Sequence, residues 1–290
     1  MHIKTDFFKL LNIINCTFKM HYKFGYLLNK RYIFLKYINY GAFSQIWLIY
    51  DILLNDYCIA KVIDSDNIET GRNEINILRK LKRLLISNNN LINNILLFRE
   101  IIESEKEIII IENLQDLNLK DLIYDYKLET KEKEQIIELI NKQINPVLIF
   151  LKNNSILHTD IKPENILIGC DDKLKLADFG WSVVNLDNKR DTFCGTKDYL
   201  SPEICQEKIY TKAIDIWCIG ILCYELLTGE CPFDLGNKSL QAIKHMIPTE
   251  EIKFPSYLSK EAISFIKKCT IKNPEYRITI NEVLQDSFLQ

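Results

Sequence analysis

The sequence predicts an α+β protein in which a small antiparallel sheet precedes a larger, mainly helical part. Short apolar stretches broken by polar turns run from Arg31 to about residue 113, with one helical segment among them, and helical periodicity dominates from Leu117 onward. Strands grouped before helices favour segregated layers over an alternating α/β fold. The polar stretch 112–116 marks the expected boundary, which gives an extension at 1–30, a small lobe at 31–113 and a large lobe at 114–290.

The composition is that of an ordinary globular chain, with 47% hydrophobic and 26% charged residues among 290. A net charge of −2 gives no general attraction to nucleic acid or an acidic membrane, so neither is expected as a partner. The nine cysteines include no C-x-x-C pair, which favours free thiols over disulfides or zinc. The longest uncharged run, 84–98, has 15 residues with five asparagines and is too short and polar to span a membrane.

The N-terminal extension carries a roughly helical apolar stripe and lacks an uninterrupted signal-peptide core. The stripe consists of Phe7, Phe8, Leu10, Leu11, Ile13 and Ile14. A helix packed on the lobe behind it or a poorly ordered tail explains it without a special function. The alternative is a targeting or partner-binding helix.

Two strand-like stretches, 32–38 and 46–50, flank a tight loop with Phe43 at its tip. Only Gly41 supplies a glycine in this loop, while Asn39 tolerates a positive φ and Ser44 can donate a hydrogen bond to a phosphate. Taken alone, the loop is equally well explained as an ordinary hairpin.

Lys61 interrupts the apolar strand 58–63, where an unpaired ammonium would cost desolvation free energy. Glu74 lies on the apolar face of the following helix, about 70–85, together with Leu78, Leu81 and Leu85. Burying either charge alone would cost free energy, so we expect an ion pair between Lys61 and Glu74. The alternative is that Lys61 extends to solvent and Glu74 lies at the edge of the stripe.

The stretch 156–167 presents Asp160, Lys162 and Asn165 between apolar residues, as expected of a loop held in a core at each end. A second carboxylate, Asp178, follows 18 residues later in Ala-Asp-Phe-Gly, where Gly180 is expected to let the chain turn sharply. Between them, 166–168 and 174–176 predict a short hairpin, which would bring both carboxylates to the same side.

A D-x-K-P-x-N loop followed at this spacing by D-F-G resembles the eukaryotic protein kinases, over about residues 31–288. The resemblance implies a two-lobed fold that binds ATP and Mg²⁺. It implies that Asp160 accepts the proton of the incoming hydroxyl, that Lys162 neutralises the γ-phosphate, and that Asn165 and Asp178 bind Mg²⁺. The implied nucleotide-binding residues are Asn39, Tyr40, Gly41, Ala42, Phe43, Ser44, Ile46, Lys61, Glu74, Glu112 and Leu114.

Lys162, two residues after Asp160, is the serine/threonine pattern, and Thr196 is expected to bond both residues. The segment 178–203 resembles an activation segment, and Glu203 is expected to pair with Arg277. Asp215 is expected to cap the backbone of the loop from the start of a buried helix, about 213–228, which ends at Gly229.

The segments 178–183, 192–200 and 220–225 most resemble the Aurora group of mitotic kinases, with other basophilic serine/threonine kinases as the alternative. Aurora-like chains are phosphorylated on a threonine preceded by basic residues, which implies Thr192 here. However, Thr159 replaces the family's H-R-D arginine and Asn73 lacks a basic side chain, so fewer groups could bind that phosphate. We therefore expect a weaker dependence on Thr192 phosphorylation.

Glu164 and Glu225 stand where arginine-directed kinases bind a substrate arginine two residues before the acceptor, although both could be solvated surface acids. The Aurora resemblance also implies chromosome segregation and spindle checkpoint control, the nucleus and spindle with the cytoplasm as an alternative, and an activating partner docked on the small lobe. A nucleotide-binding scaffold that transfers little phosphate is the rival, because the loop at 39–44 is poor in glycine and the H-R-D arginine is missing.

Overall fold

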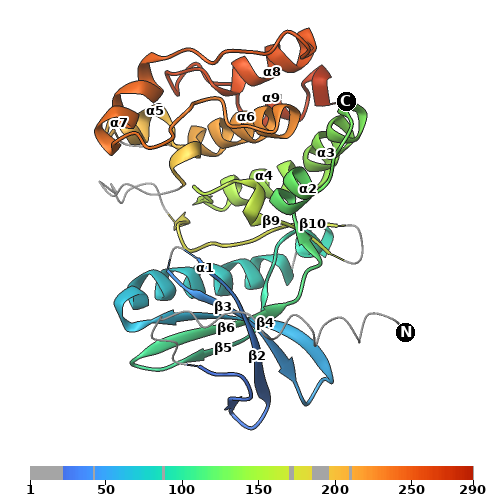
Figure 1. Ribbon diagram of the computed structural model, residues 1–290, viewed down its shortest axis with the longest axis vertical. Coiled ribbons are helices and arrows are strands. Elements are labelled where there is room, and N and C mark those ends of the chain that lie inside the picture. Colours follow the sequence, from blue (N-terminus) through green and yellow to red (C-terminus); the bar gives the residue numbers. More distant parts are fainter. Residues whose placement is uncertain are drawn as a thin grey trace. The chain divides into compact units, whose positions relative to one another are not determined.

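The computed structural model describes residues 22–41, 43–86, 89–169, 173–184, 196–208 and 211–289. They form two compact units, given by the described parts of Met1–Arg72 with Phe98–Leu114 and of Asn73–Leu97 with Gln115–Gln290 (Figure 1). The first is a curled antiparallel sheet and the second is mainly helical, which confirms the predicted α+β class. The division at Leu114 lies next to the expected lobe boundary, whereas most of α1 belongs to the second unit rather than to the small lobe.

The sheet of the first unit has six strands in the order β1-β2-β3-β4-β6-β5. Alternate residues of β2, β3 and β4 face a core built from Tyr32, Phe34, Trp47, Ile49, Cys58, Ala60 and Val62. This alternation explains why the sequence pattern located the strands. Their bounds are β1 Leu27–Leu28, β2 Tyr32–Tyr40, β3 Gln45–Asp51, β4 Asp56–Asp64, β5 Phe98–Glu103 and β6 Glu107–Asn113.

Residues 22–30 pack against this sheet and supply its strand β1, although the sequence places them in the extension. Tyr22 is buried and its ring stacks on Phe34 with the centroids 4.4 Å apart. Strand β1 pairs with β2, with Leu27 opposite Ile33. The folded unit therefore begins before Arg31. The apolar stripe at 7–14 lies outside the described residues.

The α-helices are α1 Ile68–Ile86, α2 Leu119–Asp125, α3 Thr130–Gln143, α4 Asn145–Asn153, α5 Pro202–Cys205, α6 Ala213–Thr228, α7 Leu240–Thr249, α8 Lys260–Cys269 and α9 Ile280–Val283. Short 3₁₀ turns occupy Ser65–Asn67, Asn89–Asn94, Pro163–Asn165, Lys197–Tyr199 and Ser287–Leu289. The helical pattern expected after Leu117 is divided between α3 and α4 at Ile144, because Pro146 near the start of α4 has no N–H to continue the earlier helix.

Helix α6 is the buried centre of the second unit, and almost all of its residues are inaccessible to solvent. It ends as expected at Gly229, which has a φ of +81°. At Gly220 an added Cβ would lie 2.7 Å from both Cys269 Cβ and Thr270 Cγ2, so glycine is required for α6 to approach α8.

Two small sheets in the second unit hold the stretches that carry Asp160 and Asp178. β9 Ile166–Ile168 and β10 Leu174–Leu176 form the predicted hairpin, and β7 Leu117–Asn118 pairs with β9. β8 Ile156–Leu157 pairs with β11 Val183–Val184. The stretch before Asp160 and the stretch after Asp178 are therefore adjacent strands.

The six described cysteines are free thiols, as expected, five of them buried. Among the residues that the structure describes, no helix has both the length and the apolar character needed to cross a bilayer.

Candidate active site

Asp215, at the start of α6, binds the backbone of the loop at 158–165. Its carboxylate accepts the backbone N–H of His158 at 3.1 Å and of Thr159 at 2.9 Å, which confirms the expected cap. Burial raises the pKa of Asp215, and its interactions with His158 and with these two N–H groups oppose that rise. Thr159 has a φ of +64°, a strained conformation for a β-branched residue. The two bonds to Asp215 help to stabilise it.

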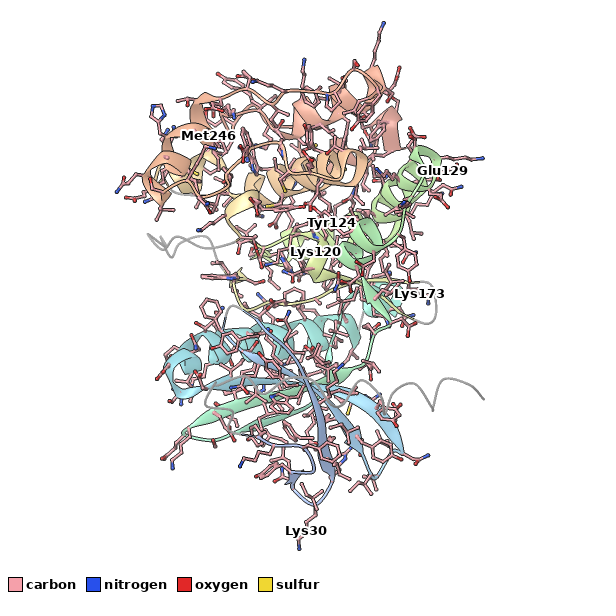
Figure 2. All side chains as sticks on the ribbon, viewed as in Figure 1. Lys30, Lys120, Tyr124, Glu129, Lys173 and Met246 are labelled. Carbon is pink, nitrogen blue, oxygen red and sulfur yellow. The ribbon has the colours of Figure 1, made fainter. Side chains whose placement is uncertain are left out.

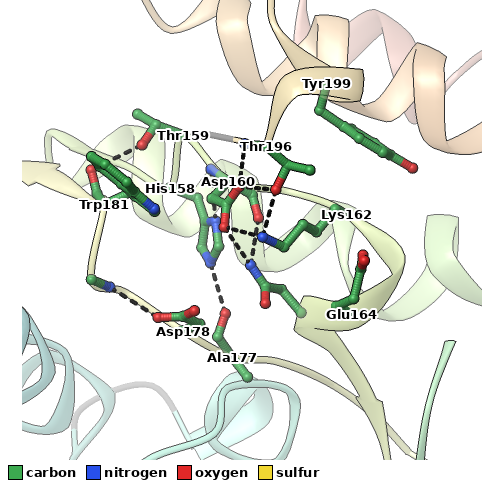
Figure 3. Close-up of polar contacts among 12 residues, drawn as sticks. His158, Thr159, Asp160, Lys162, Glu164, Ala177, Asp178, Trp181, Thr196 and Tyr199 are labelled. Carbon is green, nitrogen blue, oxygen red and sulfur yellow. Dashed lines mark hydrogen bonds and ion pairs between the residues drawn. The ribbon is translucent and has the colours of Figure 1, made fainter. Parts of the chain in front are cut away.

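Asp160 lies at the centre of a polar cluster and is only 2% exposed (Figure 3). Its Oδ2 is 2.7 Å from Lys162 Nζ and accepts a hydrogen bond from Asn165 Nδ2 at 2.9 Å. Thr196 Oγ1 lies 3.3 Å from Asp160 Oδ1 and 2.6 Å from Lys162 Nζ, so the expected triangle of Asp160, Lys162 and Thr196 is confirmed. A carboxylate with fixed donors can accept a proton without reorienting.

Asp178 lies two residues after the end of β10, and the Ala177 N–H donates to Asn165 O at 2.9 Å, which brings Asp178 near Asn165. The sequence placed a sharp turn at Gly180, and the chain does turn there, because the Ser182 N–H donates to Phe179 O at 3.0 Å across Gly180 and Trp181. The residue in the left-handed region is Asp178, with a φ of +62°. An added Cβ at 180 would lie 3.3 Å from Asp178 Oδ1 and 3.4 Å from Glu74 Oε2, so the turn passes close to both carboxylates.

The donors near Asp178 fit a hard divalent cation. The Asn165 amide nitrogen is turned to the Asp160 backbone and side chain, so its oxygen faces away from that bond. Carboxylate and amide oxygens are ligands that Mg²⁺ accepts. The described residues contain no cluster of three His, Cys, Asp or Glu side chains, so a cation here would also need oxygens from a ligand or water.

In the first unit, the predicted nucleotide-binding loop joins β2 to β3. Strand β2 continues through Asn39 and Tyr40, further than expected, and the Gly41 N–H donates to Ser44 O at 2.7 Å. Ala42 lies outside the described residues, while Phe43 and Ser44 follow in the same turn. Gly41 therefore sits at a turn tight enough for its N–H to reach Ser44.

The strand register aligns three of the predicted nucleotide-binding residues. Asn39 is opposite Ile46, and Ile46 is opposite Lys61, so the three form one row across β2, β3 and β4. Glu112 and Leu114 lie at the end of β6 and just beyond it. Lys61 belongs to the first unit and Glu74 to the second, and their pairing stays a prediction.

Glu225 does not have the solvated surroundings of an ordinary surface acid, whereas Glu164 is partly exposed. Glu225 is 5% exposed and accepts hydrogen bonds from the hydroxyls of Tyr124, at 2.6 Å, and Tyr199. Glu164 pairs with Lys120 Nζ at 2.8 Å, and this bond raises the pKa of Lys120. Figure 2 shows Lys120 and Tyr124 together on α2.

Asp198 belongs to the same cluster. Burial raises its pKa, and the negative charges of Glu225 and Glu164 raise it further. Sequence reasoning missed Lys120, Tyr124, Asp198 and Tyr199. The spacing of four between Lys120 and Tyr124 could have shown that they share a helix face.

Glu203 and Arg277 form the predicted bidentate pair, with Arg277 Nη1 and Nη2 lying 2.8 and 3.0 Å from the two oxygens of Glu203. Both side chains are almost fully buried. This pair joins α5 to the stretch before α9. Thr192 lies outside the described residues.

Comparison with known proteins shows the protein family to which the chain with this site belongs. The family model described as the protein kinase domain matches residues 32–289. The chain belongs to the protein kinase family, whose members are phosphotransferases that use ATP and a divalent metal.

Within that family the chain is most similar to the Aurora kinases. It is 32% identical to an Aurora kinase of Encephalitozoon cuniculi over 86% of this chain and 90% of that protein. It is 32% identical to an Aurora kinase of Yarrowia lipolytica over 86% of this chain and 65% of that protein. The match to Aurora kinase A-B of Xenopus laevis, 37% identical, covers 55% of this chain and 39% of that longer protein.

Proposed function

We propose that this chain is a serine/threonine kinase that transfers the γ-phosphoryl group of ATP to basic protein substrates. The cluster of Asp160, Lys162 and Thr196 is the observation that carries the proposal. Asp160 accepts the proton of the substrate hydroxyl as its oxygen attacks the γ-phosphorus. The bond from that phosphorus to the bridging oxygen breaks, and ADP leaves with the oxygen.

The remaining roles follow from the donor at each position. Lys162 stabilises the γ-phosphate with its ammonium, beside the carboxylate that receives the proton. Asn165 and Asp178 would hold Mg²⁺, which supplies positive charge to the phosphates. Lys61, paired with Glu74, would bind the α- and β-phosphates, and the turn at Gly41 would cover them. The backbone near Glu112 and Leu114 would meet the adenine.

An ATP and Mg²⁺ transfer assay on an arginine-rich serine peptide tests the proposal, with Asp178→Asn as the control. We expect the wild type to transfer phosphate and the variant to lose at least about a hundredfold in rate, since it removes a metal-binding charge. Equal incorporation by the two proteins would support the scaffold reading instead. Repeating the assay with threonine or tyrosine in place of the peptide's serine tests which hydroxyl is the acceptor.

The cluster of Glu164 and Glu225 supports a preference for arginine two residues before the acceptor. Tyr124 and Tyr199 fix the Glu225 carboxylate with neutral donors, so no direct ion pair has to break before it accepts a substrate guanidinium. A peptide array in which that arginine becomes alanine should show a loss of rate. No loss would refute the preference.

We also propose that activity depends only weakly on phosphorylation of Thr192. Thr159 and Asn73 offer no guanidinium or ammonium group to a phosphate at that position. Turnover of Thr192→Ala should stay within about tenfold of wild type, since few charge-assisted bonds would be lost. A collapse of several hundredfold would refute the idea.

The similarity to Aurora kinases supports a role in chromosome segregation and spindle checkpoint control, in the nucleus and on the spindle, with an activating partner on the first unit. A fluorescent fusion of the full chain should concentrate on the spindle in dividing cells. A uniform cytoplasmic signal through division would count against this role.

A further inference from the structure

The segment that follows Asp178 is tied to its surroundings by uncharged hydrogen bonds. Thr159 Oγ1 donates to the backbone oxygen of Trp181 at 2.9 Å (Figure 3), and Asn73 Nδ2 donates to the backbone oxygen of Ser182 at 2.9 Å. We call Thr159 and Asn73 the carbonyl clamp. It holds two consecutive carbonyls that begin three residues after Asp178.

The side of the segment facing the catalytic loop is fixed as well. Ser182 Oγ donates to His158 O at 3.1 Å, and β11 pairs with β8 from the next residue on. Ser182 is fully buried and Thr159 is 3% exposed, so water does not readily replace these bonds. A carbonyl deprived of its donor here would lose a hydrogen bond that solvent cannot easily restore.

The backbone conformation indicates that the Thr159 hydroxyl has a positioning role. Thr159 keeps a β-branched side chain at a φ of +64°, a strained backbone conformation that the surrounding contacts must hold. That conformation directs the hydroxyl to Trp181 O while the N–H of the same residue donates to Asp215. One residue therefore joins the base of the catalytic loop to the segment after Asp178.

Asn73 makes the corresponding connection from α1. The next residue, Glu74, has its Oε2 within 3.4 Å of the position that a Gly180 Cβ would occupy. Neighbouring residues of α1 therefore contact the turn after Asp178 and the carbonyl of Ser182. A shift of the segment would have to break the Asn73 bond.

We propose that the carbonyl clamp positions Asp178 for metal binding without any phosphate, so that Thr159 and Asn73 are positioning residues for phosphoryl transfer. The inference rests on the proposed role of Asp178 as a metal ligand. A charged phosphate clamp would weaken as salt or phosphatase is added, whereas two hydrogen bonds between uncharged, partly buried groups would not. The carbonyl clamp therefore predicts that the Mg²⁺ dependence of phosphoryl transfer changes when these uncharged side chains are replaced.

Thr159→Val keeps the branched shape and removes the hydroxyl, and Thr159→Ser restores the hydroxyl. The readout is the Mg²⁺ concentration for half-maximal transfer at saturating ATP and peptide. We expect Thr159→Val to raise it about threefold to tenfold, as the loss of one buried hydrogen bond implies, and Thr159→Ser to stay within about twofold of wild type. The peptide KM should not change, because neither variant alters the Glu164 and Glu225 cluster.

Matched controls separate positioning from folding. The hydroxyl of Thr270 donates to Ile266 O at 2.8 Å, so Thr270→Val removes a buried bond of the same kind away from the segment. Asn154→Ala is the counterpart for Asn73→Ala, since Asn154 Nδ2 donates to Phe150 O at 2.8 Å. Thermal unfolding of each variant shows whether its fold is retained.

The proposal is overturned if Thr159→Val matches wild type in Mg²⁺ dependence, if Thr159→Ser falls with it, or if Thr270→Val shifts the metal dependence equally. Wild-type transfer that Asp178→Asn abolishes would show that the proposed function stands even then. Equal rates for wild type and Asp178→Asn would instead remove the proposed function itself.

Discussion

Asp160 and Glu225 are both buried carboxylates of the helical unit, but their hydrogen-bond partners differ. Asp160 has a cation, Lys162, at 2.7 Å and donors from Asn165 and Thr196. Among the residues that the structure describes, Glu225 accepts hydrogen bonds from tyrosine hydroxyls and the Cys231 thiol. One carboxylate is in direct contact with a cation of the protein, and the other is held by uncharged donors, with Lys120 acting on it at longer range.

This difference separates two kinds of preorganisation. A group that takes part in proton transfer needs a fixed position and a stabilised charge in the absence of substrate. A recognition group needs a fixed position but gains by forming its first direct ion pair with the substrate. Substitutions of the carboxylates and their partners can break or sharpen the contrast.

The largest effect is expected for Asp160→Asn, which keeps the shape and removes the proton acceptor. The rate of transfer should fall about 10²–10⁴-fold, the usual contribution of a positioned general base, with little change in peptide KM. Steady-state kinetics measure both. Asp286→Asn is the control, because Asp286 is also buried and pairs with Lys268 away from the site. An Asp160→Asn rate within tenfold of wild type would contradict the contrast.

A buried carboxylate with a purely structural cation provides the next test. Arg277→Ala leaves Glu203 buried without its bidentate partner, so the free energy of unfolding should fall by about 3–5 kcal/mol. Urea unfolding measures this loss. Lys142→Ala breaks a pair with Glu138 in which both side chains are exposed, and it should cost less than about 1 kcal/mol. Equal losses in the two variants would show that the burial of Glu203 does not matter.

Glu225→Gln should act on substrate binding rather than on turnover. The peptide KM should rise about tenfold, because one charge-assisted hydrogen bond is worth about 1.5–3 kcal/mol, and kcat should change little. The same measurement with alanine two residues before the acceptor serves as the control and should show no difference. A lower kcat with an unchanged peptide KM would contradict this role, because it would place Glu225 in catalysis rather than in substrate binding.

The smallest effect is expected at Asp198, whose pKa is raised by burial and by Glu225 and Glu164. Between its unfolded and folded pKa the native state binds more protons, so stability falls as pH rises through that window. At pH 7 Asp198→Asn should therefore be slightly more stable than wild type, by less than about 1 kcal/mol because the group is partly exposed. Urea unfolding should show this gain in stability disappearing below about pH 4, where Asp198 is protonated in both the folded and the unfolded protein. A gain that persists there would have another cause.

Short-range spacing predicted the hairpin between Asp160 and Asp178. The bonds of Thr196 and the Asp215 cap join residues 34 and 56 positions apart, and they were predicted from the resemblance to protein kinases. The strands could be predicted because their alternating residues face one core. Roles in catalysis and binding remain predictions at all of these positions.

The missed features depend on contacts between distant parts of the sequence. Tyr124 and Glu225 are separated by 101 positions, and no local pattern shows that α2 and α6 bring them together. The sequence did not predict the positive φ of Asp178, because local propensity does not show where tertiary contacts hold a residue in a strained conformation. Strand β1 is too short to carry an alternating pattern.

The stacking of Tyr22 on Phe34 bears on where a recombinant fragment should start. The family match begins at residue 32, but a fragment cut there would lose Tyr22 and β1 and leave the ring of Phe34 and the edge of β2 uncovered. Such a truncated protein would tend to aggregate through that open edge, whereas a fragment starting at Tyr22 would keep the edge closed.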